Sequence, residues 1–468
     1  MLISGQTAFG QAKTKLQARE KYLVLDSRVI ASVDNASLSV GKVTKHPSNP
    51  LFVEDKAWEM RYDNLYGNVI YDEQEKIYKC WYSPFIVDAE WSKDWTLDKR
   101  NTKRYRPGRG REMGICYATS KDGLTWIKPE LGLASYDPKN RSKRDSGDKK
   151  NNIVLRGPHG AGVFRDEHDP DPKRRYKTIF QGLKTSVSPD GLNWSKPKKC
   201  KGVTVAGDTH NNAFWAPTLG KYVGITRTKA RPNGRQVARI ESDDFVNWTK
   251  EVVILEGTSN KQQTYAMPVF FRNNVYIGLI AIFDIPSNRV WTELAWSADT
   301  KKWNRISPGT PLIPCATKKL DYDYGCIYPC AYPVFQKDKI MLYYGGSDYL
   351  HNGWRTGSLC LATLRPDGLA GYEPSDKKKP ATITTQAVVF SGESLKISAD
   401  AKGGSVEIEL LDENGNPIAT ATKISENVTD HVVKFTGDTK LTGKQVTLRF
   451  KLTGAKLYAF SFGKVVSR

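Results

Sequence analysis

The chain has 468 residues, 11% of them aromatic, and a formal net charge of +21 at pH 7. This length allows a large core and more than one domain. The sequence contains no apolar run of about 18 residues, so no membrane-spanning helix is predicted. The charge predicts attraction to polyanions, but no helix-turn-helix, RNP or basic-zipper pattern is present, so nucleic acid is not an expected partner.

The chain begins with a polar stretch. Residues 1–17, MLISGQTAFGQAKTKLQ, have no apolar core of the length that a secretory signal needs, so no signal peptide is predicted. The next apolar run, YLVLDSRVI (22–30), reads as a β-strand because it is rich in branched and aromatic residues.

A short phrase then recurs along the chain, in its fullest form Ser-x-Asp-Gly-Leu-x-Trp. It stands at residues 120–126, 188–194, 242–248 and 297–303, with a worn fifth copy at 365–372. Its aspartates are spaced by 68, 54, 55 and 68 residues. A period of this length is typical of one four-stranded propeller blade with its loops, so five copies predict five blades.

The phrase predicts a tight turn between the third and fourth strands of each blade. Glycine adopts positive φ at little cost, and aspartate hydrogen-bonds to its own backbone. The tryptophan is expected to begin the outer strand and to pack between blades. Upstream of each copy, pairs of short apolar runs predict the inner and second strands: GNVIYD with IYKCWYS, AGVFRD with RYKTIFQ, NNAFWAP with KYVGITR, AMPVFFR with VYIGLIAIF, and AYPVFQ with KIMLYYGG.

The character of the chain changes after the charged linker SDKKKPA (375–381). The remaining segments alternate apolar and polar residues, and DENGNP contains the Asn-Gly pair of a β-hairpin. The predicted fold class is therefore all-β, a five-bladed β-propeller followed by a C-terminal β-sandwich. The expected domains are a propeller over 1–375, with an N-terminal extension over 1–30, and a sandwich over 382–468.

Seven cysteines are present, and none forms a Cys-x-x-Cys pair, so a zinc site is not predicted. Most lie in strand-like apolar runs and read as small buried residues. Cys80 and Cys116 are expected on neighbouring strands, which leaves a disulfide between them open.

Propeller geometry places the functional face just before each inner strand, opposite the repeated turns. Asp63, Asp208 and Asp323 stand at three of these entrances, and His159 and His210 stand at two. Glycoside hydrolysis uses such a set, because one carboxylate attacks or activates water while a second acid protonates the leaving oxygen. A single aspartate beside a turn would more often be a simple cap.

The chain resembles the five-bladed-propeller glycoside hydrolases of families 32, 43, 68 and 117, most of all family-32-like bacterial proteins of the planctomycete type. The resemblance covers nearly the whole chain and rests on these segments: YLVLDSRVI, HPSNPLF, AWE, NVIYDEQEKIYKCWYS, FRDEHDPDPKRRYKTIF, GDTHNNAFW, KYVGITR, DYGCIY, YYGG and GAKLYAFSF. It implies a periplasmic or secreted location and no cofactor, and it leaves room for a structural Ca²⁺ in the propeller channel.

The resemblance transfers onto individual residues only in part. Asp63 stands where family 32 has its nucleophile, although the following stretch lacks that family's proline, and Asp208 stands where family 43 has its pKa-tuning aspartate. The acid glutamate of the fourth blade is missing. The acid is therefore expected from Asp323, from Glu293, or from a histidine such as His210 or His351.

The loops around the same mouth are basic. KRNTKRYRPGRGR (99–111) holds seven lysines and arginines, and TKARPNGR (228–235) adds more. Arginine's planar fork suits sulfate and carboxylate groups, so an anionic carbohydrate is the expected partner. The predicted substrate-binding residues are Trp58, Glu59, Arg61, His159, Arg227, Tyr265, Tyr328, His351 and Arg355.

The sequence thus predicts an exo-acting glycoside hydrolase for an acidic or sulfated glycan. Two alternatives remain open. One is a hydrolase of neutral sugars, similar to a fructosidase or an arabinofuranosidase. The other is a non-catalytic glycan-binding propeller, which the missing fourth-blade glutamate favours.

Overall fold

The computed structural model describes residues 19–88, 90, 96, 98–99, 110–140, 143–230, 234–390, 394–436 and 443–463. These residues form two compact units. The central unit is Val40–Pro366, and the other is formed by both ends of the chain, Met1–Ser39 and Asp367–Arg468. Within the described residues, no helix has the length and apolar character that crossing a membrane would require.

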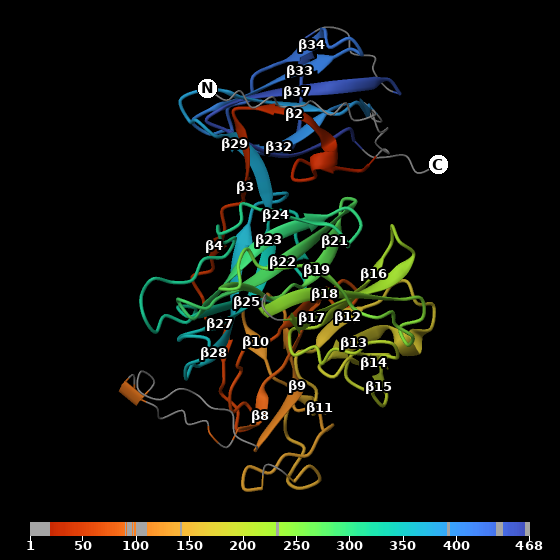
Figure 1. The fold of residues 1–468 in the computed structure, drawn as a ribbon, viewed down its shortest axis with the longest axis vertical. Helices are drawn as coiled ribbons and strands as arrows, with labels where there is room; N and C mark the ends of the chain where they lie inside the picture. Colours follow the sequence, from red (N-terminus) through yellow and green to blue (C-terminus); the bar gives the residue numbers. More distant parts are fainter. Residues whose placement is uncertain are drawn as a thin grey trace. The chain divides into compact units, whose positions relative to one another are not determined.

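The described residues form an all-β fold, as predicted, in which the strands are accompanied by the short 3₁₀ helices η1 (Ser27–Val29) and η2 (Pro172–Arg174). The central unit consists of successive antiparallel groups (Figure 1). The first comprises β6 (Asn68–Asp72), β7 (Ile77–Tyr82), β9 (Arg111–Ser120) and β10 (Trp126–Ile127), with β8 (Phe85–Asp88) and β11 (Ile153–Arg156) also paired to β9.

The next two groups are separate four-stranded sheets, each in simple sequential order. One comprises β12 (Gly162–Arg165), β13 (Tyr176–Phe180), β14 (Lys184–Ser188) and β15 (Lys198–Lys199). The other comprises β16 (Asn212–Ala216), β17 (Lys221–Ala230), β18 (Gly234–Ser242) and β19 (Val252–Leu255).

The last two groups of the central unit belong to one eleven-stranded sheet. The fourth comprises β20 (Gln262–Ala266), β21 (Val269–Arg272), β22 (Val275–Asp284), β23 (Arg289–Ser297) and β24 (Trp303–Ile306). The fifth comprises β25 (Cys326–Pro329), β26 (Val334–Phe335), β27 (Ile340–Ser347), β28 (Gly357–Leu364), β4 (Thr44–Lys45) and β5 (Phe52–Val53). A single parallel contact, Val290 with Cys326, joins the two groups.

The repeated phrase forms the predicted turn in four groups. In the copy that joins β14 to β15, Asp190 Oδ1 accepts from the backbone N–H groups of Leu192 and Asn193, each at 2.8 Å. Ser188 Oγ accepts from the N–H of Gly191 at 2.9 Å. The same bonds recur at residues 120–125, 242–247 and, through aspartate, 297–302.

The worn fifth copy does not lead into an outer strand of its own group. Instead, β4 and β5, from near the start of the central unit, pair antiparallel with β28. The prediction that each phrase introduces its own outer strand is therefore wrong for the fifth group. The physical reason is that the chain leaves the unit at Pro366, so the edge of β28 is covered by the segment that enters the unit.

The inner strands contact one another in a closed order. Asn68 at the start of β6 accepts from the N–H of Val163 in β12, and Asn212 at the start of β16 accepts from the N–H of Val269 in β21. Asn211 N–H donates to Gly160, which links β16 to the entrance of β12. The rings of Phe270 and Phe335, tilted with centroids 5.8 Å apart, link β21 to β26, and Val69 N–H donates to the oxygen of Ala331 to close the ring.

The unit formed by the chain ends has two sheets around one hydrophobic core that includes Val24, Ile383, Leu448 and Phe460. One sheet comprises β1 (Tyr22–Leu23), β3 (Ala36–Val40), β29 (Ala370–Pro374), β32 (Lys396–Asp400), β35 (Val428–Val432) and β38 (Lys456–Ser461). The other comprises β2 (Ile30–Asp34), β30 (Ala381–Thr385), β31 (Val388–Val389), β33 (Ser405–Leu411), β34 (Pro417–Ala421), β36 (Phe435–Thr436) and β37 (Gln445–Thr453).

Two sequence-based boundaries therefore need correction. The sequence predicts a propeller domain over 1–375 with an extension over 1–30, but the central unit is Val40–Pro366, and both Tyr22, which pairs with Phe460, and β29 belong to the other unit. The run 22–30 is also not one strand. Asp26 caps η1 and binds the side chains of Arg19 and Arg28, which breaks the run into β1 and β2. Packing decides both points, because the segment's apolar residues fill the core of the second unit.

The cysteines agree with the prediction that most are small buried residues. All seven are free thiols, and only Cys315 is partly exposed. Cys80 lies opposite Ala118 and Cys116 lies opposite Tyr82 across β7 and β9. The two thiols are therefore on neighbouring strands without being bonded to each other.

Candidate functional site

Asp63 lies in the loop that leads from β5 into β6. Its φ is +53°, and those of Leu65 and Tyr66 are +61° and +46°. Residues with a side chain rarely adopt this left-handed conformation, and three such residues in one short loop require strong support from their surroundings. Conformations of this kind gather at functional sites, so the loop is a candidate on backbone geometry alone.

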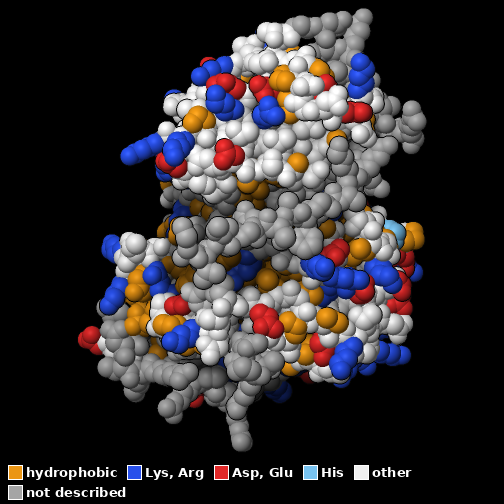
Figure 2. All heavy atoms as spheres, turned by 45° about the horizontal axis from the view of Figure 1, so that its top comes forward, with side chains coloured by type: hydrophobic (Ala, Val, Ile, Leu, Met, Phe, Trp, Pro, Cys, Tyr) orange, Lys and Arg blue, Asp and Glu red, His pale blue; other side chains and the backbone are white. Residues whose placement is uncertain are grey.

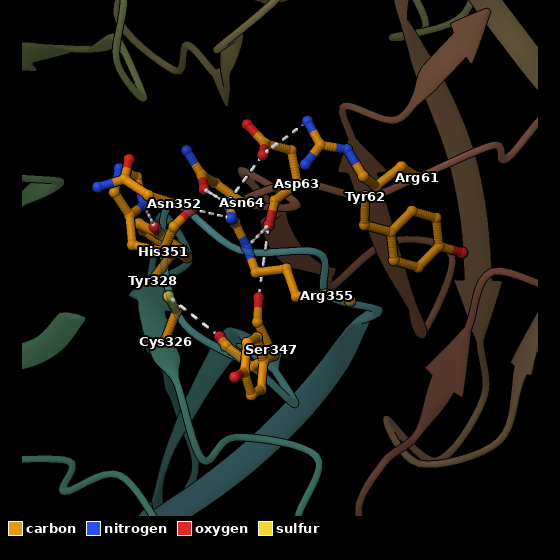
Figure 3. A network of polar contacts seen from close by, with 12 residues as sticks. Arg61, Tyr62, Asp63, Asn64, Cys326, Tyr328, Ser347, His351, Asn352 and Arg355 are labelled. Carbon is orange, nitrogen blue, oxygen red and sulfur yellow. Dashed lines mark hydrogen bonds and ion pairs between the residues drawn. The ribbon is translucent and has the colours of Figure 1, made fainter. Parts of the chain in front are cut away.

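Two arginines supply the support (Figure 3). The Asp63 carboxylate lies between Arg61 Nη2, at 3.1 Å, and Arg355 Nη2, at 2.8 Å, while the neighbouring Tyr62 ring points away from it. Arg355 also donates to the backbone oxygen of Asp63 and to Asn64 Oδ1, at 3.3 and 2.9 Å. Both arginines are almost fully buried, so they contact Asp63 from the interior of the protein.

This arrangement fixes the charge of Asp63. Burial alone would raise the pKa of the carboxyl, but Arg61 and Arg355 outweigh it and hold the pKa well below its usual range. The side chain keeps 17% of its surface exposed. Asp63 is therefore an ionised carboxylate with an open side, which suits a nucleophile or a base and excludes an acid.

Aromatic and histidine side chains surround this carboxylate. Tyr328 OH lies 2.6 Å from His351 Nδ1, and the His351 ring packs against Tyr265, with centroids 4.9 Å apart. Asn64 Nδ2 donates to the hydroxyls of Tyr66 and Tyr265, at 2.7 and 3.3 Å. The three tyrosines and Asn64 therefore form one connected layer beside Asp63.

His159 lies on the other side of Tyr66, with its ring 5.2 Å from that tyrosine and 5.6 Å from Phe85. Its Nδ1 is buried and meets no hydrogen-bond partner among the described residues. Burial lowers the pKa of His159, while the charges of Asp63 and Asp208 act in the opposite direction. The pKa of His351 is also lowered, by burial and then by Arg355.

Asp208 lies at the same end of the inner strands as Asp63, just before β16. Its Oδ2 lies 3.1 Å from Arg227 Nη2, and its side chain is 57% exposed. Burial raises the pKa of Tyr66, and the charges of Asp208 and Asp63 both add to this rise. Arg227, the partner of Asp208, lies over the ring of Tyr265, 4.7 Å from its centroid, and Tyr265 accepts from Asn64 next to Asp63, so the two carboxylates share one site.

Asp323, the third predicted carboxylate, has different neighbours. It is fully buried, where Lys45 Nζ lies 2.6 Å from its Oδ2 and the hydroxyl of Tyr344 donates to the same oxygen at 2.8 Å. These contacts tie β4 to β27, and Asp323 has no described contact with Asp63. We therefore correct its predicted catalytic role to a structural ion pair.

Glu293 is also structural. Its carboxylate is fully buried and accepts from Arg305 at 2.5 Å, from Trp291 Nε1 at 2.9 Å and from the N–H of Gly309 at 3.1 Å. All these partners belong to the fourth group or to the segment that follows it. Such a saturated carboxylate has no oxygen free for a substrate, which argues against the predicted role as acid.

Two further predicted residues, Glu59 and Trp58, form contacts inside the first group of strands. Glu59 is fully buried between Tyr82 OH, at 2.6 Å, and Lys128 Nζ, at 2.8 Å. Trp58 Nε1 donates to Asn152 at 2.7 Å, and its ring packs on Tyr136. Both side chains are engaged by contacts within the first group, and their substrate-binding roles stay predictions.

His210 is enclosed by other side chains and is not accessible to a substrate. Its Nε2 lies 3.1 Å from Asn68 Oδ1, and its ring lies 5.3 Å from that of Tyr66. Burial lowers the pKa of His210 to about 3. A neutral imidazole that is 1% exposed cannot donate a proton to a substrate, so the predicted role as acid is not supported.

Three residues that contribute to the site around Asp63 do not stand out in the sequence. Asn64 and Tyr66 lie one and three residues after Asp63 in its loop. The signal that could reveal them is that this short loop has no glycine before Gly67, although its backbone is left-handed at three residues. Arg235 stands in the sequence only as part of a basic loop. Its guanidinium lies over the rings of Tyr265 and Phe283, 5.2 Å from each centroid.

No group of three or more metal-binding side chains occurs among the described residues. At the opposite end of the inner strands lies a cavity of about 520 Å³. Its walls include Val69, Phe164, Phe214, Phe270 and Phe335, one from each inner strand. Glu73, Asp166 and Glu167 also line the cavity, but they form no metal-binding group of three among the described residues. Calcium needs six to eight oxygen ligands, so this lining does not fit the structural Ca²⁺ that the resemblance allows.

The basic loop 99–111 falls largely outside the described residues, which omit 100–109, and the loop 228–235 is described without 231–233. Figure 2 shows lysine and arginine side chains interspersed with aspartate and glutamate on the described surface of one face. The predicted attraction to an anion therefore depends, among described residues, on the arginines around Asp63 and Tyr265.

No protein-family model and no curated protein sequence matches the chain. Solved structures that are similar include an N-acetylgalactosamine deacetylase from F. plautii, at 13% identity and a TM-score of 0.46, with 72% of this chain and 97% of that chain covered. A GH62 α-L-arabinofuranosidase from Coprinopsis cinerea has 13% identity and a TM-score of 0.45, with 69% and 97% covered.

A glycosyl hydrolase from Bacteroides ovatus has 13% identity and a TM-score of 0.47, with 69% of this chain and 94% of that chain covered. These structures include glycoside hydrolases, the class that the sequence resembles. The finer resemblance to planctomycete-type proteins stays a prediction. At such low identity one fold can carry many activities, so the residues of the site must carry the functional argument.

Proposed function

We propose that the central unit is a five-bladed β-propeller that hydrolyses glycosidic bonds, and that the chain ends form a companion β-sandwich. Five blades are supported by the cavity with one wall residue from each of five inner strands. The observation that carries the function is Asp63, an ionised carboxylate with an open side, held by two buried arginines at the other end of those strands.

Asp63 would act as the nucleophile or as the base that activates water. Either role needs a carboxylate that is ionised at the working pH and is fixed in direction. Arg61 and Arg355 provide both properties, because their charges favour the ionised form and their hydrogen bonds orient the group. Asp208 would bind or orient the sugar from the exposed side, since it is held by Arg227 alone among its described neighbours.

The proton for the leaving oxygen must come from another group, because both carboxylates are paired with arginines. His159 is the candidate that the geometry favours. Its Nδ1, without a described partner, is buried next to Tyr66, and both carboxylates raise the pKa of His159 against the effect of burial. Since the net shift is downward, the protonated form would be more abundant in mildly acid solution.

The substrate that we propose is a glycan with acidic or sulfated residues, cleaved from its end. Four arginines, Arg61, Arg227, Arg235 and Arg355, lie at this end of the inner strands, against three carboxylates, Asp63, Asp208 and the buried Asp88 beside Arg61. This excess of positive charge favours an anionic ligand over a neutral one. A neutral sugar as the substrate would not account for this excess of positive charge.

A non-catalytic glycan-binding propeller is the second candidate. The observation that favours it is that no carboxylic acid lies at the site without an arginine partner, among the described residues. Such a site could hold an anionic sugar without protonating a leaving group.

Hydrolysis of a panel of neutral, uronic and sulfated oligosaccharides by the full chain tests both candidates. We expect reducing ends to be released from at least one anionic substrate and not by Asp63→Asn. Binding without any release would favour the second candidate. Turnover that Asp63→Asn retains would remove Asp63 from the reaction.

A further inference from the structure

The hairpin of β17 and β18 carries an arginine pair beside the site. We propose that Arg227 and Arg235, whose guanidiniums both lie over the ring of Tyr265, form a subsite for one oxyanion group of the substrate, a carboxylate or a sulfate. This inference rests on the proposed function for the identity of the ligand as a glycan. The arginine pair itself is defined by burial and contacts that do not depend on any activity.

Arg227 is 9% exposed, and only some of its N–H donors have a hydrogen-bond partner among the described residues. Its Nη2 contacts Asp208 at 3.1 Å, and its guanidinium lies over the Tyr265 ring, 4.7 Å from the centroid. Its Nη1 is buried and finds no acceptor of ordinary hydrogen-bond geometry among the described residues. A buried charged donor without an acceptor is costly, so the protein holds this group for a ligand or for ordered water.

Arg235 has no carboxylate within ion-pair distance in the part of the chain that the structure describes. Its Nη1 donates to the neutral amide oxygen of Gln263 at 2.9 Å, and its Nε is buried without a partner among those same residues. The rings of Tyr265 and Phe283 cover the guanidinium, with both centroids 5.2 Å away. Its positive charge is therefore held in a partly desolvated place with no described counter-charge.

The strand register brings the two arginines together. Arg227 lies opposite Val237 and Lys229 lies opposite Arg235, so Arg227 and Arg235 are diagonal neighbours on one face of the hairpin. Diagonal side chains of this kind are about 7 to 8 Å apart at the backbone, within reach of one small group for residues as long as arginine. Tyr265 lies under both guanidiniums and limits their freedom to move.

The chemistry of the pair selects the ligand. Two planar guanidiniums with unused N–H donors match the oxygens of a carboxylate or a sulfate ester, and charge-assisted hydrogen bonds of this kind are the strong ones. A hydroxyl group of a neutral sugar carries no charge to balance Arg235. The subsite should therefore discriminate in favour of anionic sugars.

Calorimetric titration of the full chain at constant ionic strength tests the inference without requiring turnover. The probes are sodium sulfate, sodium D-glucuronate and, as the neutral counterpart, D-glucose. We expect sulfate or glucuronate to bind at least about tenfold more tightly than glucose, since charge-assisted hydrogen bonds are worth more than neutral ones. The two anions distinguish a sulfate subsite from a carboxylate subsite, and binding of either supports the inference.

Arg235→Gln should weaken anion binding about tenfold or more while leaving the fold intact, because its described partner is neutral. Arg227→Gln should do the same, since the Asp208 that it releases is well exposed to water. Arg272→Gln is the matched control. Arg272 also lies over an aromatic ring, that of Phe335 at 4.4 Å, but at the cavity end of β21.

Unchanged anion binding in the double variant Arg227→Gln/Arg235→Gln, or equal binding of glucose, would overturn the inference. Arg235→Lys, which retains the charge, should recover part of the affinity and guards against a folding defect. The outcome is separable from the proposed function. Anion binding without hydrolysis of any glycan would leave the subsite standing and remove the hydrolase, whereas hydrolysis with no anion dependence would do the reverse.

Discussion

Arg355 holds Asp63 by its carboxylate and by its backbone at once. Nη2 donates to Oδ1 at 2.8 Å, and Nε donates to the main-chain oxygen of the same residue at 3.3 Å. The first contact sets the charge of Asp63, and the second stabilises its left-handed backbone. A loop with this conformation would otherwise relax, so the arginine links the electrostatics of the site to its geometry.

Asp63→Asn is expected to lower kcat about 10²- to 10⁴-fold on any glycan that the protein cleaves, because an amide can neither attack nor accept the proton. It should also destabilise the fold, by about 3 kcal/mol, since two buried arginines lose their common partner. Initial rates are compared per folded molecule, with folding measured by urea titration.

Asp323→Asn is the control for the same substitution at a buried ion pair. It should lower stability through Lys45 and leave kcat within about twofold, because Asp323 has no described contact with the site. A loss of kcat as large as that of Asp63→Asn would restore Asp323 to the reaction.

Glu293→Gln is expected to behave as a structural substitution. The amide retains the shape of the side chain but loses the charge that Arg305 needs, so a loss of about 3 kcal/mol or more in the free energy of unfolding should follow. The measurement is thermal and urea unfolding together with kcat. A stable Glu293→Gln protein without activity would contradict the assignment.

Acid should destabilise the protein in part through His210. Its pKa is about 3 in the folded protein, below the value near 6.5 of an exposed histidine, so the unfolded chain binds more protons between these two values. Stability therefore falls as the pH drops below about 6.5, and His210 accounts for about 2 kcal/mol of the loss at pH 5. Urea unfolding at pH 7.5 and pH 5 should show a smaller difference for His210→Gln. Equal differences in the two proteins would count against the buried, neutral imidazole.

The repeated turns can be tested at Gly191, which has a φ of +77°. A Cβ atom there would lie 2.5 Å from Cζ2 of Trp81, so Gly191→Ala adds a steric clash to the strain of its backbone. Gly220 has a φ of +61°, and a Cβ atom there would meet no described atom within 4 Å, so Gly220→Ala carries the backbone strain alone.

We expect Gly220→Ala to cost about 1 kcal/mol and Gly191→Ala to cost about 1 to 3 kcal/mol more, both measured by urea unfolding. Equal losses would mean that the turn does not pack against the first group. Because Trp81 Nε1 also donates to the oxygen of Gly191, at 2.7 Å, we expect the larger cost.

Periodic and local features were readable from the sequence. The spacing of the Ser-x-Asp phrase predicted the successive strand groups and four of their turns, because each of these turns is made from its own serine and aspartate. The structure brings Asp63, Asp208 and His159 to one end of the inner strands, because each stands just before such a strand, and their roles stay predictions. The short apolar runs fixed the inner strands for the same local reason.

Long-range pairing was decided only by the tertiary structure. Asp323 and Glu293 look like catalytic acids in sequence, and only the position of Lys45 and of Arg305 shows that they are structural. The N-terminal strand joins sheets formed by the far end of the chain, as Tyr22 with Phe460 shows. Such contacts depend on which distant side chains fill the same core or balance the same charge, and the sequence of one segment does not contain that information.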